Sequence, residues 1–267
     1  MTAFFVLVNV GYMSAATGQD PSRRRLTAVR IIATVMAISA IGFGLFTIVF
    51  GIVNPAQEPH AFHNAVVASL LLILSAPPAI AVARTPARPG RALVILAVLA
   101  IAGLATMALS LTLDPFTMPF VVSIGVLWAL SPSRDDLLPA GRPSPILLVL
   151  VLAAAAPLIA YALGQAELQR TDSTSSHDAF FHWVETSFYA IAVLGLGLLA
   201  ALRPGTYRAA AWSGGLALGV LGVASLMFGG YASSLPDPWP WVAIAGGTAF
   251  ISVAEWEARR ASPTSRT

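Results

Sequence analysis

The 267-residue sequence contains no cysteine and no lysine, so all 15 of its basic residues are arginines. Without cysteine, the chain can form no disulfide, no thiolate metal site and no iron–sulfur cluster. Without lysine, it can form no Schiff base with retinal or pyridoxal phosphate, and it has no phosphate-loop lysine. Any metal chemistry must therefore use histidine, carboxylate or other nitrogen and oxygen ligands.

Charge is also scarce, because charged residues make up only 10% of the chain while hydrophobic residues make up 57%. A typical soluble domain has about 25% charged and about 45–50% apolar residues. The composition therefore predicts an all-α, polytopic transmembrane helix bundle whose main partner is the lipid bilayer. The net charge of +3 does not indicate nucleic-acid binding, since the arginines are distributed as in a membrane protein.

Eight apolar runs are candidates for transmembrane helices, which need about 17–25 residues, although the fourth and eighth are slightly shorter than this. They lie at 31–53, 65–83, 92–113, 116–131, 145–164, 184–202, 209–230 and 239–254. Asp114 stands before the fourth run, where it can cap the first turn of a helix. Residues 3–17 are either a ninth span or an interfacial segment, and no basic region precedes them, so a signal peptide is not predicted.

The arginines fall almost entirely on one side of the membrane if the eight spans alternate in direction. That side carries Arg23, Arg24, Arg25, Arg30, Arg84, Arg88, Arg91, Arg134, Arg142, Arg203, Arg208, Arg259, Arg260 and Arg266. The opposite side carries only Arg170. The positive-inside rule then places the arginine-rich loops and the C-terminus in the cytoplasm. Trp183, Trp239 and Trp241 are predicted to be anchors at the outer membrane interface.

Three short motifs recur in the same order in the two halves of the chain. Ala61-Phe62-His63, Arg88-Pro89-Gly90 and Asp114-Pro115 are followed by Phe180-Phe181-His182, Arg203-Pro204-Gly205 and Asp237-Pro238. The order predicts two parallel four-helix repeats related by an axis along the membrane normal. The predicted division is an N-terminal apolar and basic segment at 1–30, repeats at 31–131 and 145–254, a linker at 132–144 and a cytoplasmic tail at 255–267.

The histidines gather at one place in this plan. All four stand just before or at the start of the second and sixth spans, on the outer side, and carboxylates accompany them; the candidate metal ligands are His60, His63, His177, His182, Asp178 and Glu185. A single helix starting at Ser175 would put Asp178, His182 and Glu185 on one face. Imidazole with carboxylate suits Zn, Cu(II) or Fe, so we expect a transition metal or a haem, with His63 and His182 as the main ligands. The alternative for these histidines is an interfacial, structural or pH-responsive role.

The centres of the spans contain hydroxyl groups but no Asp, Glu, His or Arg, which argues against an ion-coupled transporter. The arrangement is similar in plan to haem A synthase, but the Glu-His signatures of that family are missing, so the resemblance assigns no residue. The preferred hypothesis is a metal- or haem-binding redox module. The alternatives are a small permease or channel for a neutral or lipophilic solute, and a structural subunit with a membrane-protein partner or a second copy. No enzymatic activity is assigned.

Overall fold

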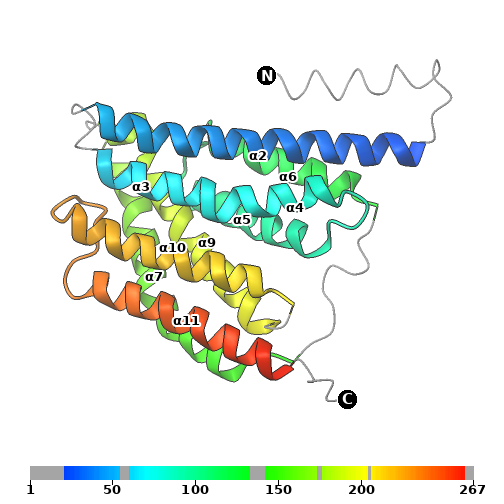
Figure 1. Ribbon diagram of the computed structural model, residues 1–267. Coiled ribbons are helices and arrows are strands. Elements are labelled where there is room, and N and C mark those ends of the chain that lie inside the picture. The colour runs from blue at the N-terminus through cyan, green and yellow to red at the C-terminus, as the bar shows by residue number, and fades with distance from the viewer. Residues whose placement is uncertain (1–20, 55–59, 133–141, 173–175, 204–205, 262–267) are drawn as a thin grey trace.

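The computed structural model is an all-α bundle and describes residues 21–54, 60–132, 142–172, 176–203 and 206–261 (Figure 1). Its helices are α2 (Pro21–Val53), α3 (Ala61–Ser69), η3 (Leu70–Ser75), α4 (Ala76–Arg84), α5 (Gly90–Ser110), α6 (Thr117–Leu130), α7 (Pro145–Thr171), α8 (Ser176–Ala179), α9 (His182–Leu202), α10 (Arg208–Met227) and α11 (Trp239–Ala261). The all-α prediction is confirmed. The candidate ninth span at 3–17 lies outside the described residues.

Six helical segments are long and apolar enough to cross a membrane: Ser22–Gly51, Ala61–Arg84, Gly90–Ser110, Pro145–Thr171, His182–Leu202 and Arg208–Met227. Their outward faces are apolar as well, as Val35, Ile38 and Ile101 show, each being more than half exposed. Exposed apolar surface of this extent is unfavourable in water and suits a lipid environment. The protein is therefore a multi-pass membrane protein.

The prediction of eight spans is supported for only six of them. The expected span at 116–131 corresponds to α6, whose 14 residues reach about 21 Å, less than the roughly 30 Å of hydrocarbon in a bilayer. The expected span at 239–254 corresponds to α11, which has 23 residues but is not among the six apolar segments. α11 ends in Glu255, Glu257, Arg259 and Arg260, so its last two turns are charged.

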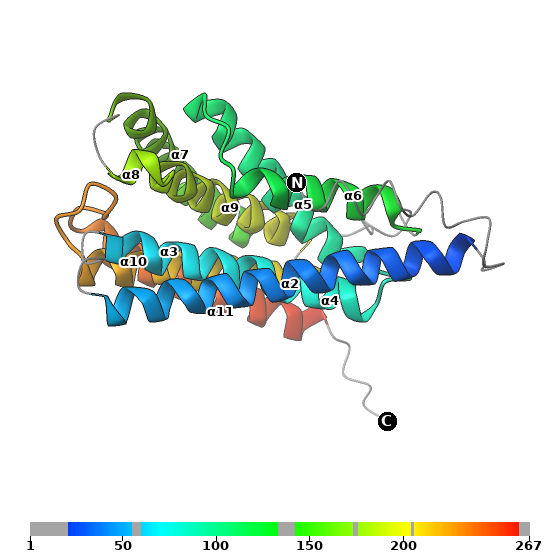
Figure 2. The ribbon, with the colours of Figure 1, turned by 90° about the horizontal axis from the view of Figure 1, so that it is seen from above.

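Consecutive long helices run in opposite directions, so their ends collect at two poles of the bundle (Figures 1 and 2). The end of α2, the start of α3 and the short α8 lie at one pole. The end of α4 at Arg84, the start of α10 at Arg208 and the end of α11 lie at the other (Figure 1). The histidine-bearing helix starts are thus separated from these arginines by the length of the bundle. The cytoplasmic location of the arginine-rich pole remains a prediction. The relation of the two halves as repeats also remains one.

The second span changes its helical form in the middle. Residues Leu70–Ser75 form a π-helix between α3 and α4, and Pro77 and Pro78 follow directly in the first turn of α4. Proline has no N–H to donate, so an α-helical bond pattern cannot continue through this pair. The backbone therefore changes to a π-helix directly before this proline pair. In contrast, α7 continues through Pro157.

The turn between α5 and α6 depends on Asp114, a fully buried residue. Its Oδ1 accepts a hydrogen bond from the backbone N–H of Phe116 at 2.8 Å, and its Oδ2 accepts one from that of Thr117 at 3.1 Å. A carboxylate in this position satisfies N–H groups that the first turn of a helix leaves without partners. The predicted capping role of Asp114 is therefore confirmed.

Candidate functional site

The four histidines come together at the pole where α3 and α9 begin. The ring centres of His60 and His63 lie 4.6 and 4.9 Å from that of His177, and 5.0 and 4.8 Å from that of His182. The ring centres of His177 and His182 are 5.7 Å apart. We call these four residues the histidine cluster. Two sequence segments more than 100 residues apart thus meet, which the sequence alone does not establish.

Two short local structures position these rings. His60 stands immediately before α3, and His63 lies in the first turn of that helix. In the other segment, α8 ends at Ala179, and Phe181 has a left-handed φ of 62° before α9 begins at His182. A left-handed conformation is costly for a residue with a side chain, by about 1–3 kcal/mol, and such residues concentrate at functional sites. This turn separates His177 from His182 and lets both rings face the α3 pair.

The same turn corrects one prediction. A single helix from Ser175 would have placed Asp178, His182 and Glu185 on one face, but the helix is interrupted after Ala179. Asp178 instead accepts a hydrogen bond from Nε2 of Gln169 on α7, at 2.5 Å from its Oδ1. Ser175 itself is outside the described residues. The interruption could not be read from the sequence because Phe180-Phe181 contains no glycine or proline.

The histidine cluster is buried on its α3 side, where His63 is 1% exposed and His60 is 8% exposed. Burial, followed by the neighbouring charges of His182 and His177, lowers the pKa of His60 from its ordinary value. A neutral imidazole has an unprotonated nitrogen that can bind a metal ion. His60 is therefore in the form required of a ligand at neutral pH.

The hydrogen bonds of His63 determine which of its ring nitrogens carries the proton. Its Nδ1 lies 3.1 Å from the hydroxyl of Thr186, and this hydroxyl donates its only hydrogen to the carbonyl of His182 at 2.8 Å. The hydroxyl can then only accept from His63, so Nδ1 must be the protonated nitrogen. In the neutral ring, Nε2 is left with a lone pair.

The nearest hydroxyl, that of Ser233, does not donate a hydrogen bond to Nε2 of His63. Ser233 Oγ is 3.5 Å from Nε2, but it donates its hydrogen to Oε1 of Gln165 at 2.6 Å. The backbone carbonyl of Ser233 in turn accepts from the hydroxyl of Tyr161 at 2.5 Å. This network holds Ser233 in place and leaves Nε2 of His63 available to a Lewis acid.

His182 has the same arrangement with a different partner. Its Nδ1 lies 3.2 Å from Oε2 of Glu185, one turn further along α9. An ionised Glu185 would accept the Nδ1–H and leave Nε2 as the basic nitrogen of the ring. Histidine ligands of metal ions characteristically donate their second nitrogen to a carboxylate or other oxygen in this way. Glu185 is 8% exposed, so this pair is largely shielded from water.

Trp183 is part of this site and not the interface anchor that its position near a span end predicts. It is 3% exposed, and its ring stacks on His177 with centres 5.0 Å apart. It also meets the ring of His63 edge-on, at 5.4 Å. Thr186, Ser233 and Gln165 were equally absent from the predicted site. Their contacts join segments distant in sequence, and no local pattern marks them.

The spacing of the four rings suits a metal ion better than a haem. With a metal–nitrogen distance of about 2.0–2.1 Å, imidazole ring centres around one tetrahedral ion lie about 5 Å apart. The separations in the cluster are 4.6–5.7 Å, which leaves no space for a planar macrocycle between the rings. Within the described part of the chain, however, no three His, Asp or Glu side chains already have their donor atoms placed to hold a metal ion. Binding would therefore require the rings to turn.

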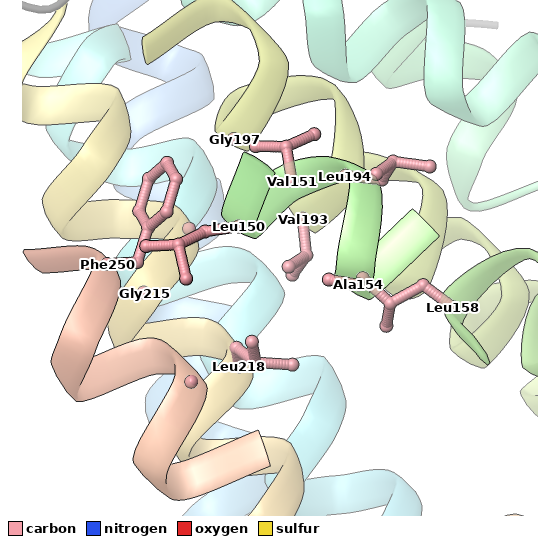
Figure 3. Close-up of a pocket in the computed structure, with 12 residues that line it drawn as sticks. Leu150, Val151, Ala154, Leu158, Val193, Leu194, Gly197, Gly215, Leu218 and Phe250 are labelled. Atoms are coloured by element: carbon pink, nitrogen blue, oxygen red, sulfur yellow. The ribbon is translucent and has the colours of Figure 1, made fainter. Parts of the chain in front are cut away.

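A separate cavity of about 70 Å³ lies between α7, α9, α10 and α11 (Figure 3). Its lining includes Val151 and Leu158 of α7, Gly197 of α9, Leu218 of α10 and Phe250 of α11, and all of its lining residues are apolar or glycine. Recognition of a polar solute requires convergent polar side chains, which this cavity lacks. The histidine cluster is therefore the better candidate for a functional site.

No protein-family model, curated protein or solved structure matches this chain. Its function has to be inferred from the geometry of the histidine cluster.

Proposed function

We propose that this multi-pass membrane protein binds a divalent transition-metal ion through His60, His63, His177 and His182 at one pole of its helical bundle. The observation that supports this most directly is the state of His63 and His182. Both are held through Nδ1 by an oxygen of the protein, so that the lone pair of Nε2 is the one left for a ligand. The two rings stack with centres 4.8 Å apart and planes inclined by 14°.

Chemistry and charge favour a borderline metal ion such as Zn(II) or Cu(II). Four neutral imidazoles add no negative charge to a buried site, and imidazole is a ligand that these ions prefer. Metal–nitrogen bonds would compensate for the burial of the polar rings of His60 and His63. In this proposal Glu185 is a positioning residue for His182. Asp178 is not a ligand, because its carboxylate is hydrogen-bonded to Gln169.

The test is a metal analysis of the full-length protein without a histidine tag. The protein is purified in mild detergent, stripped with a chelator and titrated with Co(II), Cu(II) and Zn(II), and bound metal is counted by plasma mass spectrometry. We expect one tightly bound ion per chain and, for Co(II), a visible absorption band typical of nitrogen ligands. A chain that retains no metal would overturn the proposal and favour the permease or structural alternatives, neither of which needs a metal.

The substitution Glu185→Gln tests the positioning role of this carboxylate. The amide is similar in size and can still accept from Nδ1 of His182, but it has no charge to increase the basicity of the ring. We expect metal affinity to fall roughly 10-fold, at the lower end of the 10- to 100-fold that such partners contribute. The Co(II) absorption band should also shift, which a purely structural role would not produce.

The matched control for this substitution is Glu257→Gln. Glu257 lies in the last turns of α11 at the opposite pole, where it accepts a hydrogen bond from Ser144. It should leave metal affinity unchanged. Equal affinities and identical spectra in the Glu185→Gln and wild-type proteins would exclude a role for Glu185 in holding His182 for the metal.

A further inference from the structure

Trp183 forms one wall of the histidine cluster. It follows His182 directly in the first turn of α9, stacks on His177 at an interplanar angle of 25° and approaches His63 at 83°. The two contacts come from different segments of the chain, so the indole ring touches a histidine from each half of the cluster. Any small molecule held by the four imidazoles would have this ring beside it.

The indole nitrogen of Trp183 is buried and has no hydrogen-bond partner in the structure. An indole N–H can only donate, and a buried donor without an acceptor costs about 1–3 kcal/mol. Folded proteins rarely leave such a group unsatisfied, and where they do, an ion, a water molecule or a ligand commonly supplies the partner. Stacking alone would not require this tryptophan, because phenylalanine stacks equally well without burying a polar N–H.

His63 and His182 are not available as acceptors for the indole N–H of Trp183. The hydrogen bonds of Nδ1 of His63 and of Nδ1 of His182 are made with Thr186 and Glu185. Nε2 of both rings is assigned to the metal in the proposed function. Among the residues that the structure describes, the indole N–H has no acceptor, so a ligand from outside the protein is the partner we consider.

We infer that the indole N–H of Trp183 donates a hydrogen bond to a small exogenous ligand that the metal ion holds beside the imidazoles. The ligand class is a small anion with a lone pair beyond the one given to the metal, such as hydroxide or azide. A donated hydrogen bond stabilises the anionic form of such a ligand relative to its protonated form. This inference rests on the proposed metal site and adds a second, non-protein ligand to it.

The experiment uses the full-length Co(II)-loaded protein titrated with azide and followed by the visible absorption of Co(II). The variant Trp183→Phe retains a ring for stacking on His177 and removes the N–H. We expect its Co(II) affinity to stay close to that of the wild-type protein, while its azide dissociation constant rises roughly 10- to 100-fold, the range for a hydrogen bond to a charged group. A second variant, Trp183→Tyr, restores a donor at the ring edge and should recover part of the azide affinity.

Trp241→Phe is the matched control, since Trp241 is 61% exposed on α11 and has no contact with the cluster in the structure. It should leave both affinities unchanged. Normal Co(II) loading with equal azide affinity in the Trp183→Phe, Trp183→Tyr and wild-type proteins would overturn the role of Trp183 and leave the metal site standing. Failure of the wild-type protein to bind Co(II) would instead overturn the proposed metal site, and this inference with it.

Discussion

Replacing both His63 and His182 by alanine is expected to abolish metal binding, with bound metal falling from one ion per chain to none. Each single replacement should weaken binding by more than the roughly 10- to 100-fold that is typical of residues that only hydrogen-bond to a ligand, because it removes a ligand itself. His63 and His182 are the two rings whose Nδ1 atoms are held by Thr186 and Glu185. In the proposed site their Nε2 atoms are the ones left for the metal, once the rings turn toward it. The measurement is the metal content together with a Co(II) titration of each variant.

The control must separate loss of a ligand from loss of the fold. His63 is almost fully buried, so an alanine there leaves a cavity that lowers the free energy of unfolding. The variant His63→Gln fills more of this space and should still lose metal affinity. Thr248→Val, on the exposed face of α11 where the hydroxyl bonds only to its own helix, should behave like the wild-type protein. Retention of one tightly bound ion in the folded double variant would show that the cluster is not a metal site.

The sequence predicts most of the membrane-embedded architecture because lipid imposes a simple length rule. About 20 apolar residues are needed to cross the hydrocarbon, so six of the predicted spans could be recognised without any knowledge of packing. The run at 116–131 is predicted as a span although it has only 16 residues, and α6 covers 14 of them. Its apolar composition suggests a span, but its length is too short to cross the hydrocarbon as a helix.

The sequence marks the four histidines as candidates, but it shows neither that the two pairs meet nor which groups orient the rings. All four histidines stand at corresponding helix starts, and alternating spans bring those starts to one pole. The Thr186, Ser233 and Gln165 contacts depend on how α3, α7, α9 and the segment before α11 pack together. Such contacts follow from tertiary geometry, for which a serine or threonine in an apolar sequence gives no specific signal.

The glycines of α10 and α11 lead to the second large expected effect. The glycine-rich sequence of α10 predicts a close helix contact, and α10 packs along α11 in the structure (Figure 1). A Cβ atom added at Gly215 would lie 2.6 Å from Cγ1 of Ile251 and 2.8 Å from the carbonyl oxygen of Gly247. A Cβ added at Gly247 would overlap the carbonyl oxygen of Gly215. The backbones of α10 and α11 are therefore in direct contact at Gly215 and Gly247. An added methyl group at either position would push the two helices apart. By contrast, a Cβ at Gly219 would meet no atom within 4 Å, so the close contact is confined to part of the glycine-rich stretch.

Gly247→Ala is therefore expected to lower the free energy of unfolding by about 1–3 kcal/mol, the usual cost of overpacking a well-packed contact. Gly246→Ala is the matched control, because its added Cβ would have only Leu218 Cδ2 nearby, at 3.8 Å. Both substitutions replace glycine by the better helix former in the same turn, so the gain in helix propensity is common to both. Thermal unfolding in detergent should therefore show a lower midpoint for Gly247→Ala and an unchanged or higher one for Gly246→Ala. Equal midpoints would mean that α10 and α11 are not in backbone contact at this position, and the packing of the C-terminal helix described above would then be wrong.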